Sequence, residues 1–252
     1  MRRSAAALGV ALAIALLASP TASGHPGHGR NALEVRPGPG AIAKALDKAE
    51  PGDKLRIHSG RYREAIEVTA PVTIVGARKG RRPVIDAQCS ALFTVSVRSP
   101  GVVLRGLKVV GATDLGGAGT EVDVRGVARG TVEDLVVRDT CDAEYGVNVF
   151  QTGAVSVLDT RATGFSDVGI YVGDITDTAG ATLLVGGNEA FGNNKGVIVE
   201  FSTGASIRVE ETTSKTTRSP ERARRRGCTS TTAPVLTSSA TGFATTGASA
   251  FT

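Results

Sequence analysis

Short runs of β-branched and aliphatic residues recur through the middle of the chain at nearly constant spacing. One series begins at Val122, Val147, Ile170 and Val197, so successive runs start 25, 23 and 27 residues apart. A second series lies between these runs, at Val103–Leu107, Val132–Leu135, Val155–Leu158, Leu183–Val185 and Ile207–Val209. Repeats of about 20 to 50 residues are typical of solenoids, and short β-runs within each repeat predict a β-solenoid.

Alternation within the runs predicts which side chains face the core. If Val147, Ile170 and Val197 form one inward column, Asn148 and Tyr171 lie on the outer surface, because successive side chains of a strand point to opposite faces. A glycine precedes each of these three runs, at positions 146, 169 and 196. These glycines predict tight corners at which φ is positive.

A short amphipathic helix is expected before the repeats. Residues 40–50 place four apolar side chains on one face, and Pro51-Gly52 ends the pattern. The first coil of a solenoid leaves backbone groups and the apolar interior open, so we interpret this helix as an N-terminal cap. Strands are expected next at 54–58, 65–68 and 71–75, and the repeat domain as a whole at 40–211.

The N-terminal end reads as a targeting segment. Residues 1–24 combine two arginines, a short apolar run and then small residues, which is typical of a secretory signal peptide; a membrane anchor is the alternative. Residues 25–39 are expected to be a flexible mature N-terminus. Beyond the first segment no apolar stretch is long enough to span a bilayer, so we expect a secreted, extracellular protein with no stable membrane insertion.

The repeat pattern stops near residue 211. Of the 41 residues in 212–252, 18 are Ser or Thr and none is Asp or Asn. Such a segment buries too little apolar surface to order itself, so it is either a disordered tail or the product of a shifted reading frame. The coils are then expected to end at Ile207–Glu210 with an exposed strand edge, which predicts end-to-end self-association.

The net charge of +5 does not indicate a nucleic-acid partner. Residues 1–24 carry +2 and residues 212–252 carry +5, whereas residues 25–211 carry 21 basic and 23 acidic side chains, a balance of −2. No basic stripe therefore follows the repeats. Aromatic residues make up only 4% of the chain, which also disfavours a base-stacking surface.

Cysteine placement predicts one disulfide. Cys89 and Cys141 both lie in turn-like segments, and export permits oxidation, so we expect a bridge that ties the first coils to the middle of the solenoid. The alternative is two buried free thiols. Cys228 lies in the Ser/Thr-rich segment and is left without a partner by this pairing.

The chain resembles the right-handed parallel β-helix proteins of the pectate-lyase-like superfamily. Its segments Ala41–Leu46, Pro51–Leu55, Gly60–Glu64 and Pro71–Gly76 are similar to an opening shared by pectin methylesterases and by the copper-site maturation protein of nitrous oxide reductase. Thr140–Val149 and Gly164–Gly173 look most like uncharacterised secreted actinobacterial β-helix proteins. The resemblance implies an all-β fold with a short capping helix, and it says little about function.

The resemblance leaves enzymatic activity open. Within the repeat domain at 40–211 the chain lacks the paired Asp-Asp and Gly-His of polygalacturonases, the later catalytic segments of pectin methylesterases and the Asp-Pro-His-Asp of alginate epimerases. Pectate lyases need clustered aspartates for calcium and an arginine base, which no single motif guarantees. If the protein is an enzyme, a polysaccharide lyase or an epimerase-like activity is expected.

Carboxylates and tyrosines on adjacent coils form the candidate site. Side chains on neighbouring coils lie about 4.8 Å apart along the axis, which suits an acid/base pair, a sugar ring or calcium. The candidate catalytic residues are Asp142, Glu144 and Asp167. The candidate substrate-binding residues are Tyr145, Asn148, Tyr171 and Asp174, and the weak calcium candidates are Asp139, Asp142 and Asp167. The alternative is that the carboxylates are solvated turn formers.

Two functions of different classes follow. The first is binding, with or without processing, of an extracellular or cell-surface polysaccharide along the solenoid face. The second is a non-catalytic structural or maturation role, like that of the copper-site maturation β-helix proteins. No cofactor is certain from the sequence, and calcium is the candidate.

Overall fold

The structure is a computed structural model that describes residues 31–216 except 78–79, 177, 201 and 203–204. The expected signal peptide, Cys228 and most of the segment 212–252 lie outside the described residues. Within the described residues, no helix has the length and apolarity needed to cross a membrane.

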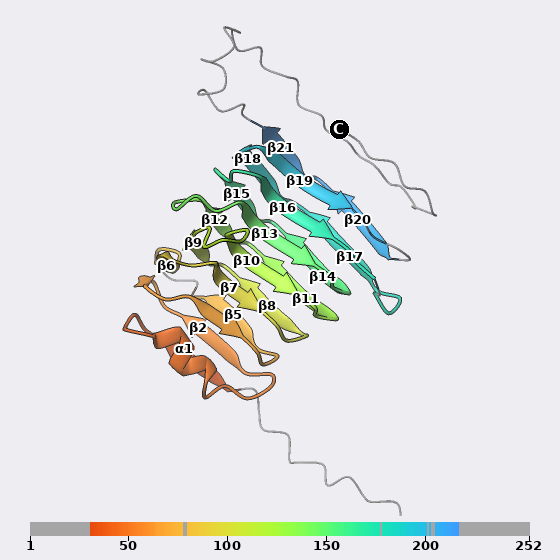
Figure 1. Cartoon of the computed structure of the whole chain (residues 1–252). Helices are drawn as coiled ribbons and strands as arrows, with labels where there is room; N and C mark the ends of the chain where they lie inside the picture. Colours follow the sequence, from red (N-terminus) through yellow and green to blue (C-terminus); the bar gives the residue numbers. More distant parts are fainter. Residues whose placement is uncertain (1–30, 78–79, 177, 201, 203–204, 217–252) are drawn as a thin grey trace, which may run out of the picture.

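In the part of the chain that the structure describes, three parallel sheets of eight, seven and six strands make up the fold, and the chain visits them in turn (Figure 1). Sheet A has eight strands: β1 (Ala32–Val35), β2 (Lys54–Ile57), β5 (Thr73–Gly76), β8 (Val102–Arg105), β11 (Arg129–Glu133), β14 (Ala154–Leu158), β17 (Thr182–Gly186) and β20 (Ser206–Glu210). Sheet B has seven: β3 (Arg61–Tyr62), β6 (Val84–Ala91), β9 (Lys108–Ala112), β12 (Val136–Arg138), β15 (Arg161–Thr163), β18 (Glu189–Asn193) and β21 (Thr213–Thr216). Sheet C has six: β4 (Ile66–Val68), β7 (Phe93–Val97), β10 (Thr120–Arg125), β13 (Tyr145–Phe150), β16 (Val168–Gly173) and β19 (Lys195–Glu200).

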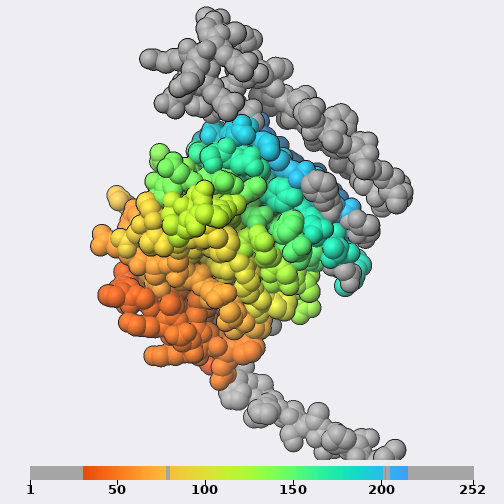
Figure 2. Space-filling view, in the orientation of Figure 1, coloured from red at the N-terminus to blue at the C-terminus, as the bar shows by residue number. Residues whose placement is uncertain are grey.

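Each complete coil contributes one strand to each sheet, and the coils stack in chain order from the N-terminal to the C-terminal end (Figures 1 and 2). Every strand pair is parallel and joins strands from adjacent coils, as when β13 pairs with β10 on one side and β16 on the other. The predicted fold class, an all-β parallel β-helix, is therefore confirmed.

The core is a stack of inward aliphatic columns. In sheet C, Val122 pairs with Val147, Val147 with Ile170 and Ile170 with Val197, as the spacing predicted. The first three are fully buried, and Val197, on the last strand of the sheet, is half-buried. Each coil therefore needs the coils above and below it to bury its apolar side chains fully.

Sheets A and C coincide with the two predicted series of runs, whereas sheet B was not predicted as a separate layer. Two of its central strands, β12 and β15, have only three residues each, too few for a recognisable alternation.

Two predicted boundaries differ from the structure. Residues 25–39 were expected to be flexible, but residues 32–35 form β1, which pairs with β2. The repeats were expected to stop at residue 211, but β21 at residues 213–216 pairs with β18 and continues sheet B. Strands β1 and β21 are both held by backbone hydrogen bonds to a neighbouring strand. Such pairing does not require an alternating apolar pattern in the segment itself, so the sequence pattern did not reveal these two strands.

Helix α1 (Ala41–Leu46) lies at the N-terminal end of the stack, in the place predicted for the cap (Figure 1). It is shorter than the expected 40–50. Ile42 is fully buried at the end of the core. Both carboxylate oxygens of Glu64 accept hydrogen bonds from the first helical turn, one from Ile42 N–H and one from Ala43 N–H, each at 3.0 Å. These bonds satisfy donors that a helix start leaves open.

The glycines at the start of the sheet C strands serve a different purpose from the one predicted. Gly146, Gly169 and Gly196 lie inside their strands, and none has a positive φ. A Cβ at Gly169 would lie 2.4 Å from Asn193 Nδ2 and 2.9 Å from the Gly196 carbonyl oxygen. Close packing, rather than a left-handed turn, requires glycine there.

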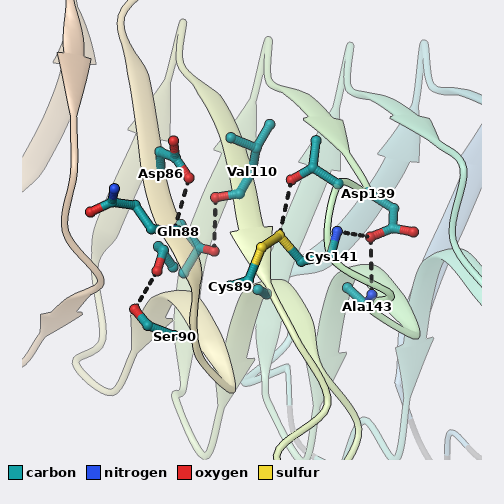
Figure 3. Close-up of a disulfide and its surroundings, with 12 residues drawn as sticks. Asp86, Gln88, Cys89, Ser90, Val110, Asp139, Cys141 and Ala143 are labelled. Carbon is teal, nitrogen blue, oxygen red and sulfur yellow. Dashed lines mark hydrogen bonds between the residues drawn. A yellow bond between two sulfur atoms is a disulfide. The ribbon is translucent and has the colours of Figure 1, made fainter.

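The predicted disulfide between Cys89 and Cys141 is present, with the two Cα atoms 5.4 Å apart (Figure 3). Cys89 lies in an irregular stretch of β6, where pairing with β9 shifts between Asp86 and Ala91. Cys141 follows β12 in a turn held by Asp139, whose Oδ1 accepts hydrogen bonds from Cys141 N–H (2.9 Å) and Ala143 N–H (3.0 Å). Because β9 lies between β6 and β12 in sheet B, the disulfide joins two coils that are separated by the coil containing β9.

Replacing both Cys89 and Cys141 by serine should lower the free energy of unfolding by roughly 2–4 kcal/mol, because the bridge closes a long loop in the unfolded chain. Urea unfolding of the oxidised protein and the double variant measures the difference. Mass mapping of exported protein provides the control. Alkylation of both thiols without reductant would contradict the bridge.

Candidate functional site

The outer face of sheet C, here called the sheet C face, concentrates polar and aromatic side chains on a regular lattice. Its central row runs across the six strands in register: Glu67, Ser96, Asp123, Asn148, Tyr171 and Ile198. Adjacent strands lie about 4.8 Å apart, so the row is a straight array along the solenoid axis. An extended ligand lying along this axis would contact one strand after another.

Asp123 is the centre of the hydrogen bonding on this face. Its side chain is 0% exposed, although it occupies an outward position of β10. Its carboxylate lies 2.6 Å from Arg98 Nη2 and 3.5 Å from Arg125 Nη2, and it accepts a hydrogen bond from Asn148 Nδ2 at 2.8 Å. A buried carboxylate of this kind is stable only when cations and donors surround it, as they do here.

The two arginines are fixed in position while part of each stays exposed. Arg98 lies over the ring of Phe93, 5.5 Å from its centroid, and Arg125 lies over Phe150 at 5.1 Å. The side chain of Arg98 is 28% exposed and that of Arg125 is 45% exposed. With the single carboxylate of Asp123 between them, the group presents a net positive charge, and guanidinium groups pair well with carboxylates and sulfates.

Aromatic rings lie beside the arginines towards the C-terminal end of the face. Tyr145 and Tyr171 meet edge to face with ring centroids 6.0 Å apart, and Phe150 lies 6.4 Å from Tyr171. The structure thus brings together the two tyrosines that the sequence singled out. All three rings are half-buried, so each rests on the sheet and keeps an accessible surface.

Both tyrosine hydroxyls keep their protons at neutral pH. Burial raises the pKa of Tyr145, and the nearby carboxylate of Asp167 raises this pKa further. Burial likewise raises the pKa of Tyr171 to about 12, with the hydrogen-bonded carboxylate of Glu200 adding to the effect. Asp167 also forms an ion pair with Lys195 at 3.1 Å. The C-terminal part of the face therefore offers two tyrosine hydroxyls, each hydrogen-bonded to a carboxylate from the adjacent coil, and the Asp167–Lys195 ion pair.

The remaining predicted residues lie at the corners around the sheet C face. Asp139 and Asp142 belong to the turn before β13, where Asp142 is exposed and has φ 64°. Glu144 is half-buried in the same turn, and its N–H donates to the Gly119 carbonyl. Asp174 follows β16 with φ 53°. For Asp139 and Asp142, these contacts and conformations are those of turn formers.

The structure does not gather the calcium candidates. Asp139, Asp142 and Asp167 are distributed over two turns, and in the part of the chain that the structure describes no group of three or more His, Cys, Asp or Glu side chains could hold a metal ion. The sequence prediction of Asn148 as an open binding residue also changes. Its side chain is nearly buried and donates a hydrogen bond to Asp123, the carboxylate that both arginines approach.

Sequence reasoning missed the group made by Asp123, Arg98 and Arg125. The signal was available, because Asp123 is the middle residue of Val122-Asp123-Val124, the same repeat position as Asn148 and Tyr171. The two arginines were harder to identify from the sequence pattern. Arg98 directly follows its strand and Arg125 is the last residue of β10, so neither falls within the apolar repeat.

A second buried carboxyl group, that of Glu121, lies at the corner where sheet C begins. It accepts a hydrogen bond from Thr94 Oγ1 at 2.7 Å, and the N–H of Ala112 lies 3.2 and 3.3 Å from its two oxygens. Burial raises the pKa of Glu121 to about 8, and the charge of Asp139 acts in the same direction. Glu121 is therefore mostly protonated at neutral pH.

Comparisons with known proteins show the fold. No family model and no curated protein matches the chain. Among solved structures, pectate lyase Pel9A superposes with a TM-score of 0.52 at 14% identity, over 72% of this chain and 53% of that protein. The PL6 family alginate lyase AlyGC gives a TM-score of 0.51 at 14% identity, over 73% of this chain and 28% of that protein. The chain thus spans about half the length of the first structure and less of the second, and at this identity the likeness shows the parallel β-helix fold alone.

Replacing Glu121 by glutamine should flatten the pH dependence of stability. In the unfolded chain this carboxyl group ionises near pH 4.5, but in the folded protein it stays protonated up to about pH 8. The wild type therefore loses stability as pH rises from about 4.5 to about 8, by a few kcal/mol, and the variant should not. Urea midpoints between pH 4 and pH 9 measure this. Glu133→Gln, on the half-exposed part of β11, is the matched control, and equal slopes for wild type and Glu121→Gln would contradict the assignment.

Proposed function

We propose that the protein binds an acidic polysaccharide outside the cell, along the sheet C face. The observation that carries this proposal is the pair of partly exposed arginines, Arg98 and Arg125, fixed on either side of buried Asp123. Their cation–π contacts and ion pairs hold the guanidinium groups in place before a ligand arrives. Preorganised groups lose little conformational entropy on binding.

The tyrosines extend this site along the same axis. The exposed parts of Tyr145 and Tyr171 supply ring surface for a sugar, and their hydroxyl oxygens supply hydrogen-bond acceptors, since each hydroxyl hydrogen is already donated to a carboxylate. Carbohydrate sites commonly need such an apolar surface with a few well-placed polar groups. On this reading a carboxylate-bearing sugar contacts the arginines while a neighbouring sugar unit rests on the tyrosines.

Two further observations support the proposal. Two solved structures that share the fold are a pectate lyase and an alginate lyase, and both names refer to acidic polysaccharides. The Cys89–Cys141 disulfide suits an oxidising compartment and agrees with the signal peptide expected at residues 1–24. Processing of the bound polymer belongs to the same proposal, with Tyr145, Asp167 and Lys195 as the groups that could move a proton.

Arg125→Gln should weaken binding of polygalacturonate or alginate about tenfold, which corresponds to about 1.4 kcal/mol for one charged contact. Arg125 is the better choice of the two arginines because it lies 3.5 Å from Asp123, compared with 2.6 Å for Arg98, so its loss disturbs the buried carboxylate less. Calorimetric titration of wild type and variant at two salt concentrations gives the affinities. Arg138→Gln on sheet B is the charge-matched control.

Uncharged dextran of similar length should bind far more weakly than the acidic polymers. Equal affinity for dextran and polygalacturonate, or an Arg125→Gln affinity equal to that of the wild type, would disprove an acidic ligand at this face. Following the same titrations for a rise in the ultraviolet absorbance of unsaturated products shows whether binding leads to lyase cleavage. Tyr145→Phe then tests the hydroxyl without removing the ring.

A further inference from the structure

A second outward row of sheet C, here called the end row, runs beside the central row at the carboxyl ends of the strands. In register, its members are Arg98, Arg125, Phe150, Gly173 and Glu200. Neighbouring members lie about 4.8 Å apart along the solenoid axis, which is the spacing of hydrogen-bonded strands. The row therefore begins with two guanidinium groups and ends with a carboxylate.

The glycine in the end row makes room for Tyr171. A Cβ at position 173 would lie 2.6 Å from two carbons of the Tyr171 ring, and closer still to its hydroxyl oxygen. The ring of Tyr171 therefore lies over Gly173, and its hydroxyl donates a hydrogen bond to the carboxylate of Glu200, the next member of the row. The end row thus passes from guanidinium groups through two aromatic rings to a carboxylate.

The cationic part of the face is short. Arg98 and Arg125 lie on adjacent coils, and the buried carboxylate of Asp123 neutralises one of their two charges. On the N-terminal side Glu67 is exposed and is in register with Ser96, so a carboxylate lies one strand away from the arginines. The remaining charge of +1 balances one carboxylate of a ligand, held between the two guanidinium groups.

The aromatic part of the face carries negative charge. Burial raises the pKa of the Tyr145 and Tyr171 hydroxyls, and nearby carboxylates raise the pKa of one or both further: those of Glu144, Asp167, Asp174 and Glu200. Lys195 offsets one of these charges through its ion pair with Asp167 at 3.1 Å. Both hydroxyl hydrogens are donated to carboxylates, so this part presents oxygen acceptors. It suits a sugar that brings hydroxyl or amide N–H donors, and it repels a second carboxylate.

We infer that the ligand of the sheet C face is an acidic heteropolysaccharide, in which a carboxylate-bearing sugar is flanked by uncharged sugars with hydrogen-bond donors. The acidic unit lies at Arg98 and Arg125, and uncharged units lie on the aromatic rings. This inference rests on the proposed function and names the class of polymer. Pyranose units of an extended chain follow one another at nearly the spacing of the strands. A homopolymer of uronates would therefore bring further carboxylates beside Glu67 at one end and Glu200 at the other.

Calorimetric titration with two oligosaccharides of equal length tests the class of polymer. One is a fragment of polygalacturonate, with a carboxylate on every unit, and the other is a fragment of hyaluronan, in which uronates alternate with uncharged N-acetylated sugars. At low salt the wild type should bind the hyaluronan fragment about fivefold more tightly, although that fragment carries half the charge. Glu200→Gln should shift the ratio of the two affinities about threefold towards polygalacturonate, because only that fragment places a carboxylate near position 200.

Glu50→Gln is the matched control, because it removes one exposed carboxylate between α1 and β2, away from the sheet C face. It should leave the ratio of the two affinities at the wild-type value. Circular dichroism of each variant confirms that the sheets are intact.

Arg125→Gln separates failure of this inference from failure of the proposed function. If neither fragment binds, or if Arg125→Gln leaves both affinities unchanged, the proposed function is wrong and the inference falls with it. If binding depends on Arg125 but polygalacturonate binds as tightly as hyaluronan, the inference alone is overturned. The inference alone is also overturned if Glu200→Gln leaves the ratio of the two affinities unchanged.

Discussion

Contact between identical positions on successive coils is the interaction on which the whole molecule depends. A single coil cannot bury its core alone, because the coils above and below must cover its inward side chains. The column through Val122, Val147 and Ile170 shows this, since each residue is fully buried by a residue one coil away. The same register that aligns these columns also aligns the outward positions, so a binding face is a direct result of core packing.

The outward-facing residues of sheet C are stabilised in different ways along the axis. At Asp123 the cost of burying a charge is offset by two arginines and an amide, whereas one coil later Asn148 needs only a donor–acceptor contact. Further along, Tyr171 remains partly open. The face therefore changes from ionic to aromatic over a few strands, although every residue in it occupies the same structural position.

Much of the fold could be predicted from the sequence, because two sheets have clear apolar periodicity. The short strands of sheet B could not be predicted. A strand of three residues such as Arg161–Thr163 is too short to show an apolar alternation, and it is held by backbone pairing to a strand on each side. The site could be predicted in part. Tyr145 and Tyr171 followed from the repeats, but the role of Asn148 depended on a partner, Asp123, whose burial becomes apparent only when Arg98 is placed beside it.

The path of the disulfide over β9 changes how the solenoid can come apart. Repeat proteins fray from their ends, one coil at a time, because each coil is coupled only to its neighbours. The bond between Cys89 and Cys141 couples two coils that are not neighbours, and it encloses the strand between them. Fraying from either end must therefore stop at this closed segment until the whole segment opens at once. The backbone amides of β9 should then exchange with solvent as one cooperative group, and more slowly than those of the strands at either end.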